Sequence, residues 1–202
     1  MSAKRFNIPC CLLVSLLLAA CGTSPPVRYF TLSDTVPVGL QDADDAVVLG
    51  LGPMRMAPYL DRSQIVMRSS GAEIDIDEFI RWAEPLSTAF LRVVSADVDN
   101  AVNGLSVVTF PWESAVWSRV DYRLLGEVIR FDGGPSGRVV LETQWGVVAT
   151  DSDTWPVPPR RRRYEAQMAA PGDPASLAKA MSEALARFSS DIVSELRPLL
   201  KQ

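Results

Sequence analysis

The 202-residue chain contains no histidine and only three cysteines, Cys10, Cys11 and Cys21, all near its N-terminus. Histidine is the commonest general base and the commonest metal ligand in proteins. Its absence excludes Ser-His-Asp and Cys-His catalysis and the HExxH zinc motif. Because no cysteine follows Cys21, we also expect no internal disulfide, no cysteine nucleophile and no thiolate zinc site in the folded part. No metal site and no bound cofactor other than the lipid on Cys21 are expected.

Positive charge is also scarce. The chain has 20 Lys and Arg against 24 Asp and Glu, a formal net charge of −4. Removal of an N-terminal segment that contains Lys4 and Arg5 would change that charge to −6. Non-specific binding to DNA or RNA needs clustered positive charge, so no nucleic-acid partner is expected.

Two further kinds of catalytic signature are weak or missing. Gly50-Leu51-Gly52 is followed by Pro53, which breaks the glycine-rich nucleotide-binding patterns and predicts a strand end and a turn. Paired carboxylates can hydrolyse glycosidic bonds. The group Asp75, Asp77 and Glu78 is not marked out from the other acidic residues, so surface charge is the simpler interpretation and a hydrolase is the weaker alternative.

The N-terminus has the organisation of a secretory signal. Lys4 and Arg5 precede an apolar run over residues 11–20, which is shorter than the roughly 20 residues that a membrane-spanning helix needs. Ala19 and Ala20 directly before Cys21 resemble a bacterial lipobox, in which the signal is removed and the cysteine is acylated. The pattern predicts a signal peptide over residues 1–20 and covalent lipid on Cys21. An ordinary signal peptide with an incidental cysteine is the alternative.

The residues after Cys21 bear on location. Gly22, Thr23 and Ser24 follow, with no Asp next to the cysteine. By resemblance to lipoprotein sorting in Gram-negative bacteria, this favours the outer membrane, with the protein in the periplasm. Residues 21–26 then form a short tether, and each buried CH₂ of the acyl chains adds about 0.8 kcal/mol of membrane affinity.

The remainder, residues 27–202, has the patterns of one α+β domain. Two helices are expected, one starting at Pro85 and ending near Asn103-Gly104, and one capped by Asp173 with Pro174 in its first turn. The second helix has one apolar stripe, which packs in the core or else forms a partner interface: Leu177, Met181, Leu185, Phe188, Ile192, Leu196 and Leu199. Period-two or short apolar runs predict the strands, and a turn-rich linker makes the two longest a hairpin. The predicted strands are residues 27–33, 46–51, 64–68, 73–76, 105–110, 120–131, 138–150 and 160–169, with a stiff extended segment over 154–159. We expect a single domain with a mostly antiparallel twisted sheet against which the two main helices pack.

Four segments in this order resemble the ABC-type transport auxiliary lipoprotein family, which includes the paraquat-inducible protein C lipoproteins. They are residues 25–32 (PPVRYFTL) after Cys21, residues 48–66 with the run PYLDRSQIV, residues 76–86 (IDEFIRWAEPL), and Phe110-Pro111-Trp112 with Asp121-Tyr122-Arg123. The joint presence of the second and third segments is the specific part of the likeness.

The resemblance implies a non-catalytic, accessory role. Members of this family accompany envelope transport systems built around mammalian-cell-entry (MCE) domain proteins, which carry lipids between the inner and outer membranes. It implies that the lipoprotein docks the MCE assembly at the outer membrane, and that it is a homo-oligomer that can form a ring. A periplasmic carrier that encloses a lipid in an apolar cavity is the alternative.

Six side chains are candidates for binding a partner or a lipid. Trp82 is either an exposed docking anchor or a residue packed near the start of the first helix. Trp155, beside the prolines of residues 156–159, is expected at a membrane or subunit surface. The run Arg160, Arg161, Arg162 and Arg163 suits phosphate head groups or an acidic protein surface, or else points into solvent. Because side chains alternate along a strand, only two of these four arginines can line any one site.

Overall fold

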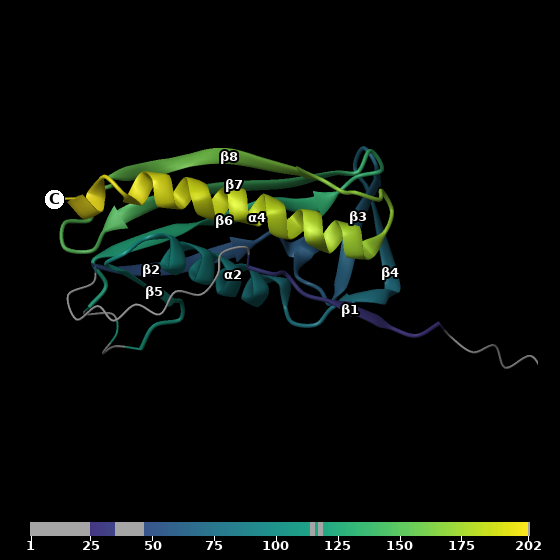
Figure 1. Ribbon diagram of the computed structural model, residues 1–202, viewed down its shortest axis with the longest axis horizontal. Helices are drawn as coiled ribbons and strands as arrows, with labels where there is room; N and C mark the ends of the chain where they lie inside the picture. Colours follow the sequence, from purple (N-terminus) through teal and green to yellow (C-terminus); the bar gives the residue numbers. More distant parts are fainter. Residues whose placement is uncertain (1–24, 35–46, 114–115, 117–118, 202) are drawn as a thin grey trace, which may run out of the picture.

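The computed structural model of the protein describes residues 25–34, 47–113, 116 and 119–201 (Figure 1). The predicted signal peptide and Cys21 lie outside the described residues. The elements in chain order are β1 (Arg28–Phe30), β2 (Val47–Met56), the 3₁₀ turn η1 (Pro58–Leu60), β3 (Gln64–Ser70), β4 (Glu73–Trp82), α2 (Leu86–Ala101), β5 (Leu105–Thr109), β6 (Tyr122–Gly133), β7 (Arg138–Ala149), β8 (Val157–Gln167), α4 (Pro174–Leu196) and η2 (Leu199–Lys201).

The eight strands form one sheet organised around β6. One edge of β6 pairs with β7, which in turn pairs with β8, and both pairings are antiparallel. The other edge pairs with β2 over the first half of β6 and with β3 at its last residue, both parallel. β5 extends the sheet beyond β2, and β4 and then β1 extend it beyond β3. The predicted α+β class, with a single domain and two main helices, is confirmed.

Both helices cover the same face of the sheet (Figure 1). α4 packs on β6, β7 and β8, while α2 packs on β2 and β5 and also against α4. The predicted apolar stripe of α4 is fully buried at Leu177, Leu185 and Phe188. Phe188 lies at the centre of the core, with its ring 5.5 Å from that of Phe90 and 5.8 Å from that of Trp145.

The N-terminus of α4 has the cap and the first turn that the sequence predicts. Asp173 caps the helix, because its carboxylate accepts a hydrogen bond of 2.8 Å from the backbone N–H of Ser176. Pro174 occupies the first turn, where its missing N–H costs nothing. At α2, by contrast, Pro85 is the residue before the helix rather than its first residue.

Four strands are longer than the sequence predicts, and β1, with three residues in place of the predicted 27–33, is shorter. β3 continues beyond the predicted 64–68 to Ser70. β2 continues to Met56 through a register shift between Leu51 and Met54, so the predicted turn at Gly50–Gly52 is instead an irregularity within the strand. β4 continues to Trp82, since its last three residues pair with β1, a partner that local patterning does not reveal, and Arg81 also pairs with Gln64 of β3. β8 begins at Val157, inside the segment expected to be extended before the strand.

The N-terminal strand and the β7–β8 turn lie at opposite ends of the long axis of the molecule. β1, through which the chain arrives from its N-terminus, runs out toward one end (Figure 1). The turn between β7 and β8 and the C-terminus lie at the opposite end. In the described part of the chain, no helix is both long and apolar enough to cross a membrane.

Candidate functional site

The face of the sheet opposite α2 and α4, here called the open face, has no helix on it among the described residues (Figure 1). Alternate residues of β6, β7 and β8 point to this face and form rows across the three strands. In one row Glu142 on β7 is in register with Arg130 on β6 and with Arg163 on β8. The next row consists of Glu127, Gln144 and Arg161.

The open face is densely charged. Six arginines and four carboxylates make ion pairs on it, which leaves a formal excess of two positive charges on a chain that is negative overall. The peripheral pairs join Arg55 to Glu127 at 3.1 Å, Arg161 to Glu142 at 2.7 Å, Arg163 to Glu165 at 2.8 Å and Arg138 to Glu165 at 3.9 Å. The hydrogen bond to Glu142 raises the pKa of Arg161 above its usual value.

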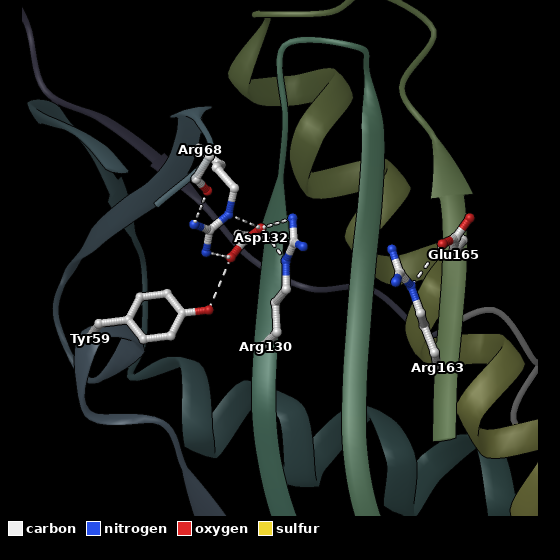
Figure 2. Close-up of polar contacts among 7 residues, drawn as sticks. Tyr59, Arg68, Arg130, Asp132, Arg163 and Glu165 are labelled. Atoms are coloured by element: carbon white, nitrogen blue, oxygen red, sulfur yellow. Dashed lines mark hydrogen bonds and ion pairs between the residues drawn. The ribbon is translucent and has the colours of Figure 1, made fainter. Parts of the chain in front are cut away.

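Asp132 anchors the end of the open face where β6 meets β3 (Figure 2). Its side chain is fully buried and accepts hydrogen bonds from three residues on three elements. Arg68 donates at 2.9 and 3.3 Å, Arg130 donates at 2.8 Å, and the hydroxyl of Tyr59 donates at 2.9 Å. Burial, reinforced by the negative charge of Asp132, raises the pKa of Tyr59 to about 12. The hydrogen bond to Asp132 also raises the pKa of Arg68. This cluster fixes η1, β3 and β6 to one another.

A shallow groove of about 390 Å³ lies at the other end of the open face. Trp155, 41% exposed, stands at its edge on the turn between β7 and β8. The groove is lined by Pro53, Arg55, Leu125, Gly126, Glu127, Gln144, Trp155 and Pro159. It therefore combines an indole ring and two prolines with a polar floor, and we call it the Trp155 groove.

The four consecutive arginines of β8 separate by face, as strand geometry requires. Arg161 and Arg163 lie on the open face in the ion pairs described above. Arg160 and Arg162 lie on the helix side, since Arg160 is in register with the buried Trp145. Arg160 is exposed and makes no ion pair with the described residues.

Arg162 links β8 to α4. Its guanidinium donates to Asp191 at 2.6 Å and to Glu195 at 2.5 Å, and lies 4.8 Å from the centre of the Trp145 ring. Tyr164 joins the same network by donating to Asp191 at 2.7 Å. Burial and the Asp191 hydrogen bond raise the pKa of Tyr164. Because Arg162 is engaged on all sides, it holds the helix on the sheet rather than presenting charge to a partner.

Trp82 also belongs to the core, with 5% of its surface exposed. It ends β4, where its backbone N–H donates to Ser63 at 2.7 Å and its register partner is Phe30 of β1. The neighbouring Glu84 accepts hydrogen bonds from Arg92 of α2 at 2.7 Å and from Thr31 at 2.9 Å. The bond from Arg92 lowers the pKa of Glu84. The segments that carry the family resemblance thus meet one another and hold β1 against the domain.

Two of the three acidic residues noted in β4, Asp77 and Glu78, bond to groups of β4 itself and of the neighbouring β3. Asp77 accepts from the backbone N–H of Phe79 at 2.7 Å, and Glu78 accepts from Gln64 at 2.9 Å and pairs with Arg81. No group of three or more metal-ligating side chains occurs among the residues that the structure describes. Glycoside hydrolysis uses two carboxylates that face each other across the scissile bond, whereas Asp77 and Glu78 are engaged in these bonds within β4 and to β3.

Comparison with known proteins identifies the family. The profile of the ABC-type transport auxiliary lipoprotein component family matches residues 30–193, which is most of the chain. The chain belongs to this family. A comparison with curated proteins finds no match.

Two solved structures share the fold of this auxiliary lipoprotein. One is described as an uncharacterized protein, with a TM-score of 0.69 and 19% identity over 85% of this chain and 99% of that one. The other is protein XCC0632 from Xanthomonas campestris, with a TM-score of 0.65 and 18% identity over 84% of this chain and 94% of that one. At these identities the likeness concerns the fold.

Sequence reasoning pointed to the arginine run and to Trp155, but it missed the residues that surround them. The pairing of β2 with β6 and of β6 with β7 brings further charged residues beside the arginine run, namely Arg55, Glu127 and Arg130. One signal was present: along the long hairpin, charged residues alternate with the apolar residues of the core face. That alternation predicts a charged outer face, although it does not identify which strands are neighbours.

Proposed function

We propose that this chain is a non-catalytic accessory subunit of an MCE-type lipid transport system, held at the periplasmic face of the outer membrane by acyl chains on Cys21. Its family, the ABC-type transport auxiliary lipoproteins, supports a role beside a transporter. The lipobox-like run ending at Cys21 supports anchoring, and the absence of Asp after the cysteine supports the outer membrane. In this role the chain docks the transport assembly to that membrane.

The proposal is supported most by a contrast between the tightly packed layer under the two helices and the open face on the opposite side of the sheet. The space between the sheet and the helices is packed by large side chains with no more than 1% exposure, among them Phe90, Phe131, Trp145 and Phe188. A lipid carrier would need an enclosed apolar cavity there. The opposite face, in contrast, is charged, open and without a cover in the described part of the chain. This distribution suits a protein that binds a partner on its surface.

The connection between β1 and the domain also suits an anchored protein. Any pull on the lipid reaches the body through β1, which has only three paired residues. The Glu84 contacts with Thr31 and Arg92 add side-chain bonds between the end of β1, the end of β4 and α2. Family likeness also leads us to propose a homo-oligomer, including a ring, which would match a symmetric tubular partner.

Anchoring is tested by Cys21→Ala in cells labelled with radioactive palmitate. The wild-type chain is expected to incorporate label and to sediment with outer membranes, whereas the variant is expected to remain an unlabelled precursor. Labelling that persists in the variant would contradict the anchor. Affinity purification of the wild-type chain from detergent-solubilised envelopes is expected to recover an MCE-domain protein. Native mass spectrometry of the purified chain measures its oligomeric state.

A further inference from the structure

We infer that the open face is the docking surface for the transport partner, and that it binds an acidic segment of that partner carrying an apolar or aromatic side chain. This inference rests on the proposed function and adds the face and the chemistry of the contact. The apolar side chain would enter the Trp155 groove, and the acidic residues would pair with Arg163 and be attracted by the charge of Arg161.

The shape and lining of the Trp155 groove indicate a protein segment. Trp155 and Pro159 form rigid apolar walls, while Gln144 and Glu127 provide hydrogen-bonding groups at the floor. Exposed tryptophan beside arginine is the composition that dominates binding hot spots. Aromatic rings also line the grooves that bind extended, proline-rich peptides. A volume of about 390 Å³ accommodates one large side chain with its flanking backbone.

The charges beside the groove favour an acidic occupant. The arginine side chains of the Arg161–Glu142 and Arg163–Glu165 pairs are 59% and 49% exposed. Exposed pairs of this kind contribute little to stability because water screens them. A partner carboxylate can therefore replace Glu165, which is 40% exposed, on Arg163 at small cost, and the planar guanidinium offers two parallel hydrogen bonds to it. Glu142 is only 21% exposed, so Arg161 keeps that partner and contributes its positive charge to the surface. The formal excess of two positive charges gives the face its preference for negative partners.

An anionic membrane is a poorer occupant of the same face. The groove lies near the β7–β8 turn, at the end of the long axis opposite the end toward which β1 runs (Figure 1). The Trp155 end of the open face is consequently remote from the point where the chain arrives from its anchor.

The test uses the full lipidated chain in cells, with a photo-crosslinking amino acid at position 155 or at position 179. Lys179 is exposed on α4 and serves as the control for the helix side. Crosslinks from position 155 to an MCE-domain protein are expected to be at least tenfold more abundant than those from position 179. Mass spectrometry is expected to map them to an acidic segment. Crosslinks from position 155 only to lipid, or only to a second copy of this chain, would overturn the inference.

Charge reversal separates specific docking from general electrostatics. Arg161→Glu with Arg163→Glu is expected to lower recovery of the partner about tenfold, and reversing the crosslinked acidic residues of the partner to Lys is expected to restore it. The matched control, Lys179→Glu with Arg197→Glu, makes the same change of charge on the helix side and is expected to leave recovery unchanged. Equal losses in both double variants would overturn the inference. If the wild type recovers no MCE-domain protein, the proposed function itself fails; if it does and the open-face variants recover it equally well, only the docking face is wrong.

Discussion

Replacing Asp132 by asparagine is expected to lower the free energy of unfolding by about 3 kcal/mol. The carboxylate is fully buried and accepts hydrogen bonds from Tyr59, Arg68 and Arg130. Asparagine keeps the shape but has only one acceptor oxygen, and its amide group would face guanidinium donors. Removing one partner of a buried pair costs about 3–5 kcal/mol. The two arginine side chains are 20% and 27% exposed, so water compensates them in part and the lower value applies.

Thermal unfolding followed by circular dichroism measures this loss. For a domain of this size each kcal/mol shifts Tm by about 2–4 °C, so a fall of about 6–12 °C is expected. Asp153→Asn is the matched control, because Asp153 pairs with Arg123 at 2.8 Å but its side chain is 83% exposed. Such a pair contributes at most about 1 kcal/mol. If the two variants shift Tm equally, Asp132 does not hold the sheet together as described.

Three further substitutions test the core, the α4 contact and the response to alkali. Leu185→Ala, at a fully buried position of α4, is expected to lower the free energy of unfolding by about 2–5 kcal/mol in chemical denaturation. The exposed control Lys179→Ala should change it little, and equal effects would mean that the apolar stripe of α4 is not part of the core. Arg162→Lys removes the guanidinium that bonds both Asp191 and Glu195 of α4, and it is expected to lower the free energy of unfolding by about 1–2 kcal/mol. It is also expected to alter the fluorescence of Trp145, and an unchanged spectrum would contradict the contact between the guanidinium and the indole ring. The pKa of Tyr59 is raised from 10.0 to about 12, so the folded state holds this proton more tightly than the unfolded state does. The resulting contribution to the free energy of unfolding is complete below pH 10 and should be lost as the pH rises from 10 to about 12. Tyr59→Phe should flatten that fall, and an identical pH profile would contradict it.

Local patterns in the sequence predict the helices and the hairpin well. The stripe of α4 and its Asp173 cap depend on residues within a few turns of one another, and both are found as expected. The hairpin of β6 and β7 is likewise joined by a short turn-rich linker. In each case the residues that interact are near neighbours in the chain, so spacing alone carries the information.

Long-range pairing is where the sequence is insufficient. β4 extends to Trp82 between two partners: β1, about 50 residues earlier, pairs with its last three residues, and Gln64 of β3 pairs with Arg81 on the other side. The partners of the arginine run also lie beyond a local pattern, since Arg161 pairs with Glu142 of β7, 19 residues away, and Arg162 with Asp191 of α4, 29 residues away. A run of four like charges therefore divides into a structural residue and surface residues according to contacts that no local pattern contains.

If this chain fastens a transport assembly to a membrane, a protein of that assembly must lie beside it in the cell. Chemical crosslinking of intact cells, with mass-spectrometric identification of the neighbours of the untagged wild-type chain, tests this most directly. An MCE-domain protein is expected as the principal neighbour apart from further copies of the chain. Recovery of the chain free of any such protein, enclosing a lipid or converting a small molecule, would contradict the account.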